Sequence, residues 1–283
     1  MTYKRLLTIQ DISCVGQCSL TVALPIISAC GTECCIFPTG VLSTHTAGFS
    51  GYTFRNLTED FSPVLSHWKK ENIKFDYVYT GYLCGADQIE YVKQTLELLN
   101  KDGLFIVDPV MADNGVFYKG FDANFAKEMG GLCGLADVIV PNITEACFLT
   151  GMEYKSSGYD KDYIEEILDK LCALGAKSVC LTGVSFEDGK IGIATIKNGS
   201  DEIFYYFKDR INHNFHGTGD IYSSTLSGGL SIGMELEEAA SLAVDYTVEC
   251  MKVSYADRKE HWYGVKFEQA LPYLTSRITQ FNK

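Results

Sequence analysis

The segment His216-Gly217-Thr218-Gly219-Asp220 has the residue types best suited to chemistry. Two glycines and a threonine before a helix would direct several backbone N–H groups at one point, where the helix dipole adds positive potential. We therefore predict an anion hole at Gly217, Thr218 and Gly219. Asp220 would lie beside the anion as a base for a hydroxyl that attacks phosphorus. A turn with a capping carboxylate is the alternative, but the small-residue run that follows, IYSSTLSGG, favours the anion hole.

Two further groups of polar residues follow short apolar runs. Asp108 and Asp113 come after LFIV, and Asn142 and Glu145 come after VIV. Carboxylate oxygens suit Mg²⁺ or a monovalent cation. If Asn142 starts a helix, Glu145 is its third residue and points back toward the cap. Capping or loop solvation explains each group alone, whereas their common place at strand ends predicts that Asp113 and Glu145 face one cleft.

Hydroxyl groups and one histidine gather on the segments 38–46 and 81–85, PTGVLSTHT and GYLCG. Both segments follow predicted strands and should line the same cleft from the opposite side. A lone histidine such as His45 is often a hydrogen-bonded structural residue. Its position between polar residues of a strand-end loop favours contact with a ligand.

The elements that must position these residues alternate along the chain. We predict strands at 5–9, 33–37, 77–80, 104–107, 138–140 and 178–181, with helices at 17–30, 58–72, 87–100 and 161–174. Strands 190–197 and 202–208 form a hairpin across Asn198-Gly199, and helices follow at 217–233, 236–256 and 266–278. Asp87 is the predicted N-cap of its helix, and Pro25 is expected to kink helix 17–30.

This order predicts an α/β fold: one domain over residues 1–283, with a largely parallel central sheet flanked by helices and a β-hairpin before the anion-hole helix. In such sheets the ligand binds beyond the carboxyl ends of the strands. The polar segments above lie at those ends, so they predict one cleft formed by many loops.

The composition excludes several classes of protein. Lys and Arg number 24 and Asp and Glu 36, and the net charge of −12 disfavours binding to nucleic acid or anionic membranes. No apolar run reaches the roughly 18 residues of a membrane span, and the first residues are too polar for a signal peptide. Eleven cysteines without a C-x-x-C pair predict free thiols, mostly buried, in the cytoplasm.

Seven motifs in order resemble the pyridoxal/pyridoxamine kinase group of the ribokinase-like superfamily. They are LLTIQ, SCVGQCSLTVALP, VLSTHT, TGYL, DPVM-x-D, PN-x-x-E and GTGD. The resemblance implies ATP-dependent phosphorylation of the 5′-hydroxymethyl group of a vitamin B6 vitamer, in salvage to pyridoxal phosphate. It also implies a homodimer, ATP-Mg²⁺ and a monovalent cation, K⁺ or Na⁺.

The resemblance also implies roles for single residues. Asp220 is the expected base, and Gly217, Thr218 and Gly219 the anion hole. Expected Mg²⁺-side residues are Asp113 and Glu145, and Asp108 and Thr182 would neighbour the monovalent cation. The expected ATP contacts are Asn142, Thr182, Arg210, Gly217 and Gly219. The expected walls of the pyridine pocket are Thr39, Val41, His45 and Tyr82.

The chain departs from the group after the first strand, where the usual ring-contacting serine is replaced by Asp11, with Ser13 two residues later. An ionised Asp11 could pair with a cationic ring nitrogen or aminomethyl group. Alternatively, it caps the following helix together with Ser13. Segment 208–215 mixes charged, Asn and aromatic residues and is expected to be a mobile flap over ATP, from which Arg210 could reach the transferred phosphoryl group.

Other functions remain open at this stage. The form His-Gly-Thr-Gly-Asp also suits hydroxymethylpyrimidine kinases of thiamine biosynthesis, although their Gly-Ser-Asp-rich opening is missing. A sugar kinase would need an N-terminal Gly-Gly pair, and the Gly-Gly pairs here are at 130–131 and 228–229. A non-catalytic B6-binding protein would be expected to have lost Asp220 or the metal-side carboxylates.

Overall fold

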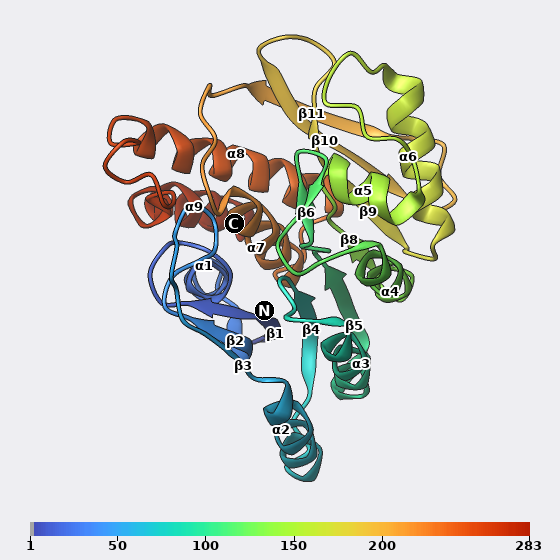
Figure 1. Cartoon of the computed structure of the whole chain (residues 1–283), viewed down its shortest axis with the longest axis vertical. Helices are drawn as coiled ribbons and strands as arrows, with labels where there is room; N and C mark the ends of the chain where they lie inside the picture. The colour runs from blue at the N-terminus through green and yellow to red at the C-terminus, as the bar shows by residue number, and fades with distance from the viewer. Residues whose placement is uncertain (1–2) are drawn as a thin grey trace.

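Strands with apolar side chains on both faces assemble into one sheet of nine strands (Figure 1). The computed structural model describes residues 3–283. The strand order is β11-β10-β9-β8-β5-β4-β1-β2-β3. The neighbours from β2 to β9 pair in parallel, whereas β3, β10 and β11 are antiparallel to theirs. The predicted α/β fold with a largely parallel sheet is confirmed.

The strands have these bounds: β1 Arg5–Ser13, β2 Glu33–Leu42, β3 Phe54–Asn56, β4 Phe75–Thr80, β5 Leu99–Val107, β8 Val138–Ile139, β9 Ser178–Val184, β10 Lys190–Lys197 and β11 Phe204–Asp209. A separate small hairpin consists of β6 Ala112–Asp113 and β7 Val116–Phe117. The helices are α1 Leu20–Ala29, α2 Thr58–Lys70, α3 Ala86–Thr95, α4 Ala123–Cys133, α5 Ile143–Thr150, α6 Lys161–Ala173, α7 Thr218–Ser231, α8 Leu236–Tyr255 and α9 Phe267–Phe281.

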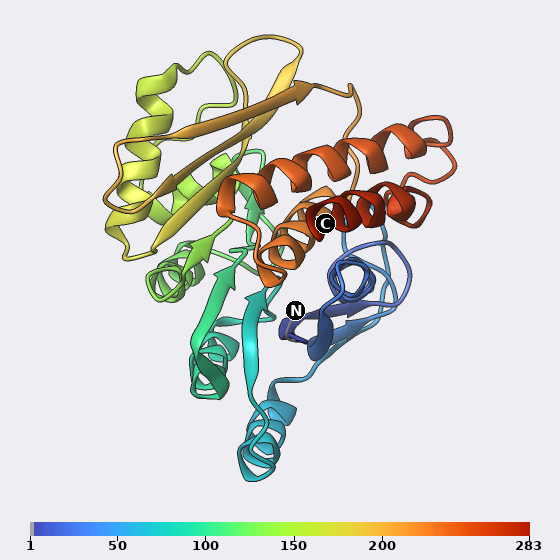
Figure 2. The same ribbon diagram turned by 180° about the vertical axis from the view of Figure 1, so that it is seen from behind.

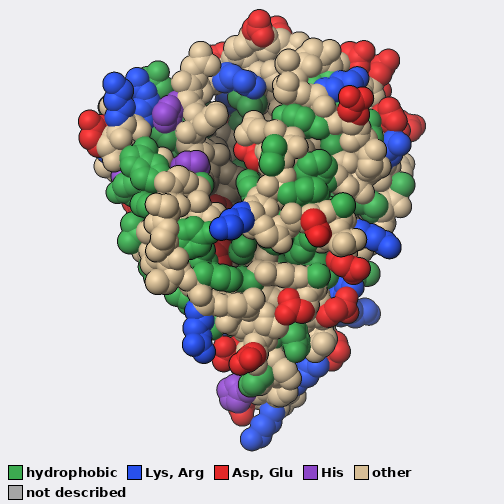
Figure 3. All heavy atoms as spheres, in the orientation of Figure 1, with side chains coloured by type: hydrophobic (Ala, Val, Ile, Leu, Met, Phe, Trp, Pro, Cys, Tyr) green, Lys and Arg blue, Asp and Glu red, His purple; other side chains and the backbone are tan. Residues whose placement is uncertain are grey.

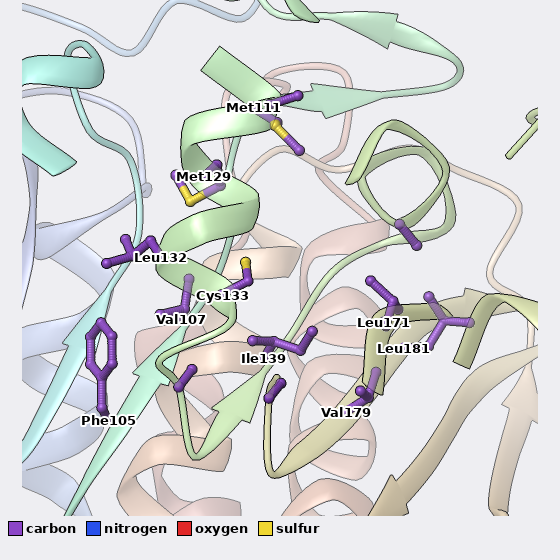
Figure 4. Close-up of a cluster of buried hydrophobic side chains, with 14 of the residues drawn as sticks. Phe105, Val107, Met111, Met129, Leu132, Cys133, Ile139, Leu171, Val179 and Leu181 are labelled. Carbon is purple, nitrogen blue, oxygen red and sulfur yellow. The ribbon is translucent and has the colours of Figure 1, made fainter. Parts of the chain in front are cut away.

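Helices cover both faces of the sheet, and each face has its own core. Helices α2 to α6 pack on one face, where Figure 4 shows Met129, Leu132 and Cys133 of α4 beside Val107 and Ile139 of the sheet. Helices α1, α7, α8 and α9 pack on the other face, and Figure 2 shows the last three side by side. Within residues 3–283, no helix is both long and apolar enough to cross a membrane.

The predicted elements are largely present, with shifted ends. Helix 87–100 is shorter than predicted: α3 ends at Thr95, a 3₁₀ turn covers 96–98, and β5 begins at Leu99. Asp87 is not the N-cap, because the cap is Gly85 and Asp87 lies in the first turn. Pro25 lies inside α1 as predicted.

Three regions were missed by the sequence analysis: the edge strand β3, the small hairpin β6–β7 and the helix α4. Helix α5 begins after Asn142, where the sequence analysis considered a helix start. The hairpin had a signal, since Asn114-Gly115 has positive φ at both residues, as a two-residue hairpin turn requires. The start of helix α4 also had a sequence signal, the N-cap residue Asp122. Its side chain accepts hydrogen bonds from the backbone N–H groups of Asn124 and Phe125.

Helix α7 lies at the centre of its layer and is buried on every side from Ile221 to Ser231. Its small residues allow the neighbouring helices to approach closely. A Cβ atom on Gly228 would lie 2.6 Å from the Cys30 sulfur, and one on Gly229 would lie 3.0 Å from the Ala239 Cβ. The glycines therefore set the distance from α7 to α1 and α8, and so the position of its amino end.

We predict that Gly228→Ala destabilises the protein by about 1–3 kcal/mol, because the new methyl group overlaps the Cys30 sulfur. The double variant with Cys30→Ala should recover part of this loss, since it removes that sulfur. Urea unfolding measures both. The matched control is Gly131→Ala in α4, where no atom lies within 4 Å of the new Cβ and little or no loss is expected. Equal losses at positions 228 and 131 would contradict the packing argument.

Candidate active site

The strand order reverses its direction between β1 and β4, because β1 is followed in the sheet by β2 on one side and by β4 on the other. A parallel sheet opens a crevice at such a point, beyond the carboxyl ends of its strands. In the view of Figure 3, the molecular surface is hollowed near its centre, and acidic side chains are visible inside the hollow. The residues predicted to do chemistry come from the loops around this crevice.

The residues of the predicted anion hole lie at the amino end of α7. Gly217 is the N-cap with φ of 83°, and a Cβ atom there would collide with the Gln17 carbonyl oxygen, so glycine is required twice over. Among the described residues, no backbone carbonyl accepts a hydrogen bond from the N–H groups of Gly217, Thr218, Gly219 or Asp220. These unpaired donors and the helix dipole make this end of α7 suited to bind an anion.

Asp220 lies in the first turn of α7, half-buried, against the segment that precedes α1. Burial raises the pKa of its carboxyl to about 7, and the negative charge of Asp11 acts in the same direction. The Ser19 backbone N–H and the Cys18 thiol partly oppose this by hydrogen bonding to the carboxylate. A carboxyl group with a pKa near neutrality can take up a proton and release it again at neutral pH.

Asp108 follows β5 and lies below Asp220 in the crevice. It is buried, and its Oδ2 accepts a hydrogen bond of 2.7 Å from the Ser223 hydroxyl of α7. Burial raises its pKa well above the ordinary value, and the charge of Asp220 adds to this, whereas the Ser223 hydrogen bond opposes it. The end of β5 and the amino end of α7 are therefore joined by a side chain that favours holding a proton.

Asn142 and Glu145 form the capping box that the sequence suggested. Asn142 Oδ1 accepts from the Glu145 N–H, and Glu145 Oε2 accepts from the Asn142 N–H, both at 2.9 Å. Glu145 Oε1 also accepts from the Met111 N–H at 3.1 Å, and the Asn142 amide donates to the Ala112 carbonyl at 2.9 Å. Thr182 pairs beside Asn142, with its N–H donating to the Pro141 carbonyl. These side chains hold the segment after β5 in place.

Tyr118 is a residue that the sequence analysis missed. Burial raises the pKa of its phenol, and the charges of Glu145, Asp113, Asp220 and Asp108 raise it further, in that order. The phenol therefore lies close enough to all four carboxylates for their charges to act on it. Tyr118 follows the β6–β7 hairpin, and its N–H donates to the Met111 carbonyl. Predicting the β6–β7 hairpin from the sequence would have been necessary to place Tyr118 near these carboxylates.

Asp113 lies at the exposed turn of that hairpin, where its carboxylate accepts from the N–H and the side-chain amide of Asn114. In the part of the chain that the structure describes, no three His, Cys, Asp or Glu side chains gather closely enough to hold a metal ion between them. Asp113 is exposed, whereas Glu145 is buried with both oxygens accepting from backbone N–H groups, so the two carboxylates do not by themselves form a metal cage.

Asp11 and Ser13 lie within β1 rather than beyond it. Both are buried, and the Ser13 hydroxyl donates to Asp11 Oδ2 at 3.0 Å. Burial raises the pKa of Asp11, which hydrogen bonds from Ser19 and Ser13 partly offset. Ser19, the N-cap residue of α1, hydrogen-bonds to Asp11, so the Asp11 carboxylate lies beside the amino end of α1. Asp11 also lies close enough to Asp220 to influence its pKa.

The predicted ring-pocket residues lie around Asp11. Thr39 of β2 is buried, and its hydroxyl donates to the Tyr82 carbonyl at 3.0 Å, while Val41 pairs with Ile12 beside Asp11. Both ring nitrogens of His45 are engaged by backbone. Nδ1 accepts from the Ala47 N–H at 3.2 Å, and Nε2 lies 2.6 Å from the Tyr263 carbonyl oxygen, to which it donates. His45 can therefore offer a ligand its ring but no free nitrogen.

Arg210 begins the irregular segment between β11 and α7. It is exposed, and its N–H donates to the Gly189 carbonyl. The flap predicted over 208–215 is too long at both ends. Lys208 lies in β11, where its ammonium pairs with Asp245 at 2.8 Å, and Phe215 is buried. Residues 210–214 have irregular backbone and are exposed or half-buried, as a flap requires.

Comparison with known proteins shows the family to which the chain belongs. A family model described as phosphomethylpyrimidine kinase matches residues 24–264. The pyridoxal kinase of Dictyostelium discoideum is 24% identical over 300 residues, covering 98% of this chain and 97% of the relative. The hydroxymethylpyrimidine/phosphomethylpyrimidine kinase of Aquifex aeolicus is 28% identical, covering 65% of this chain and 70% of the relative.

Two solved structures are similar over nearly their whole length. The pyridoxal kinase of Lactobacillus plantarum superposes with a TM-score of 0.88 at 30% identity, covering 96% of this chain and 97% of the other. A Bacteroides thetaiotaomicron protein, provisionally named a phosphomethylpyrimidine kinase and crystallised with pyridoxal, gives 0.90 at 32% identity, covering 96% of both chains.

The raised pKa of Asp108 predicts how stability depends on pH. The unfolded carboxyl ionises near its ordinary pKa of 3.8, whereas the folded one keeps its proton to higher pH. The folded state therefore binds more protons, and the free energy of unfolding falls as pH rises above about 4. Asp108→Asn cannot ionise, so in metal-free buffer its Tm should exceed that of the wild type at pH 8 and approach it near pH 4. A constant Tm difference across this range would contradict the assignment.

Proposed function

Because this chain belongs to the phosphomethylpyrimidine kinase family, we propose that it transfers the γ-phosphate of ATP to the 5′-hydroxymethyl group of a vitamin B6 vitamer. It is a kinase of the ribokinase-like fold, in common with its relatives named pyridoxal and pyridoxine kinases. The observation that carries the proposal is the Asp220 carboxyl, held in the first turn of α7 beside unpaired N–H groups and with a pKa near neutrality.

Each group at this end of α7 has one part in the reaction. Asp220 accepts the proton of the hydroxymethyl group, and the oxygen then forms a bond to the γ-phosphorus. The bond between that phosphorus and the oxygen of the leaving ADP breaks. The N–H groups of Gly217, Thr218 and Gly219 stabilise the negative charge on the transferred phosphoryl oxygens. Residues 210–214, with Arg210, would close over the nucleotide and exclude water.

The metal ions belong to this proposal as well. Mg²⁺ prefers oxygen ligands and is often held by one or two carboxylates together with substrate phosphates. The open crevice between Asp113 and Glu145 fits that pattern, since the chain supplies carboxylates but no complete cage. Mg²⁺ would neutralise charge on the triphosphate. Asp108 and Thr182 are the proposed neighbours of a monovalent cation, K⁺ or Na⁺.

A B6 vitamer is preferred over hydroxymethylpyrimidine as the acceptor. The pyridoxal kinase of Dictyostelium discoideum matches 98% of this chain, and the Bacteroides thetaiotaomicron protein, at 32% identity, was crystallised with pyridoxal. The name of the family supports the second candidate. An assay of ADP release with pyridoxal, pyridoxamine, pyridoxine, hydroxymethylpyrimidine and ribose tests the proposal. Turnover with the pyrimidine alone would replace it. The homodimer stays a prediction, which light scattering at micromolar concentration would test.

Asp220→Asn should retain binding of ATP and vitamer but lose turnover by about 10²–10⁴-fold, because an amide cannot accept the proton. In the wild type, kcat/KM should rise with pH through about 7, as the Asp220 carboxyl loses its proton. Steady-state rates from pH 5 to 9 and equilibrium binding check both statements. Turnover close to the wild-type rate in the variant would remove Asp220 from the role of base.

Asp11→Ser should lower kcat/KM for pyridoxamine more than for pyridoxal. Pyridoxamine carries a cationic aminomethyl group, and a charge-assisted hydrogen bond to a carboxylate is worth roughly 1.5–3 kcal/mol, or about tenfold in selectivity. Ser13→Ala is the matched control, because it removes the hydroxyl that donates to Asp11 while leaving the carboxylate. Equal losses for the two vitamers in Asp11→Ser would show that Asp11 is structural.

A further inference from the structure

The segment that connects α8 to α9 is rich in aromatic residues and lies far from the motifs in sequence. We call residues 257–265 the aromatic connector and residues 43–52, between β2 and β3, the acceptor loop. The rings of Trp262 and Phe49 lie 4.7 Å apart between centroids, and those of Tyr263 and Phe49 lie 6.0 Å apart. The aromatic connector therefore packs directly on the acceptor loop.

Two further features fix this contact. The Tyr263 carbonyl accepts the hydrogen bond from His45 Nε2 at 2.6 Å, which orients the imidazole ring. Gly48 has φ of 82°, and a Cβ atom there would lie 2.6 Å from the Trp262 ring. The acceptor loop thus reaches the indole only because glycine removes a side chain at the contact.

His261, which precedes Trp262 in the aromatic connector, links this segment to the proposed anion hole. His261 Nε2 lies 2.8 Å from Gln17 Oε1, and the Gln17 amide donates to the Glu268 carboxylate at 3.2 Å. The backbone of Gln17 in turn lies against Gly217. The rings of His45 and His216 lie 5.4 Å apart, which links the acceptor loop to the same point.

The acceptor loop also lines an open hollow of about 480 Å³. The residues that line it are Thr46, Phe49, Ser50, Gly51, Tyr52 and Lys119. This volume is in the range of pockets that bind small molecules. Phe49 therefore has two roles: part of its ring packs on the aromatic connector, and part of it lines the hollow. His45, next to it, lies close enough to Asp11 to influence its pKa.

We propose that Trp262 and Tyr263 are positioning residues for the phosphoryl acceptor, acting through Phe49 and His45. The inference rests on the proposed function and extends it, since it assigns part of the acceptor pocket to the aromatic connector. Trp262 fixes the Phe49 ring, and the Tyr263 carbonyl fixes the His45 ring. The acceptor would then bind against the Phe49 and His45 rings in fixed orientations. ATP is proposed to bind at the amino end of α7, which the connector reaches through His261 and Gln17 and not through the Trp262 ring, so loss of that ring should affect ATP little.

The test compares three variants of the full chain. Trp262→Ala should raise KM for pyridoxal by about three- to tenfold, the loss expected for an aromatic pair, while KM for ATP stays within about twofold. Trp262→Phe should recover most of the loss, because a smaller aromatic ring keeps the contact with Phe49. Tyr255→Ala is the matched control. Tyr255 is 38% exposed against 39% for Trp262, and its ring packs on Arg258 instead.

A second measurement does not depend on activity. Amide hydrogen exchange of residues 43–52 should be faster in Trp262→Ala than in the wild type and unchanged in Tyr255→Ala. Unchanged exchange in Trp262→Ala, or an equal rise of both KM values, would overturn the proposal. If the wild-type chain phosphorylates no B6 vitamer, the proposed function fails, and the exchange of residues 43–52 then decides alone whether the aromatic connector positions the loop.

Discussion

The structure depends on the interaction between the amino end of a fully buried helix and the carboxylates that face it. Asp108 and Asp220 lie at this end of α7, with Asp11 and Glu145 close by. Within residues 3–283, no lysine or arginine forms an ion pair with any of the four. The positive end of the helix dipole is the compensating charge, and it acts only within about one turn. Packing must therefore hold α7 in register, which explains the glycines that face α1 and α8.

A polar layer beneath α7 follows from the same arrangement. The side chains of Gln10, Tyr79, Ser224 and Ser227 are buried, and the Tyr79 hydroxyl lies within hydrogen-bonding reach of Gln10 and Ser224. A run of leucines would pack this space at lower cost, since burying a hydroxyl or an amide costs free energy. The layer lies next to Asp108 and Asp220, whose charges influence Tyr79. Buried polar side chains thus replace apolar ones next to the site. Functional sites are where such departures from apolar core packing are expected.

The sequence was sufficient for the fold class and for the elements whose signals are local. The hairpin at Asn198-Gly199 and the capping box of Asn142 and Glu145 were predictable, because both rest on residues a few positions apart. The ends of β1 and β2 were not. Pairing between the two strands extends them to Ser13 and Leu42, past the polar residues that mark a strand end in isolation.

The site shows the same division between local and distant signals. The anion hole and its carboxylate lie within one motif and could be identified from it. Tyr118 gains its position from a hairpin that is too short to register as strands, and Trp262 meets Phe49 across more than two hundred residues. Neither contact leaves a periodic pattern in the chain. The sequence also could not show that the His45 nitrogens are both occupied, since one partner is a backbone carbonyl at Tyr263.

That last contact bears on how the proposed acceptor is recognised. With both nitrogens engaged, His45 can contribute the face of its ring but no hydrogen bond of its own. Asp11 is a carboxylate near the pocket that is buried and already accepts from Ser13. A buried carboxylate is costly unless it is paired, and a cationic group on the acceptor would complete its pairing. Recognition by shape along the acceptor loop and by charge at Asp11 would then be separate. The anion hole at Gly217 could serve any acceptor that brings a hydroxymethyl group to Asp220.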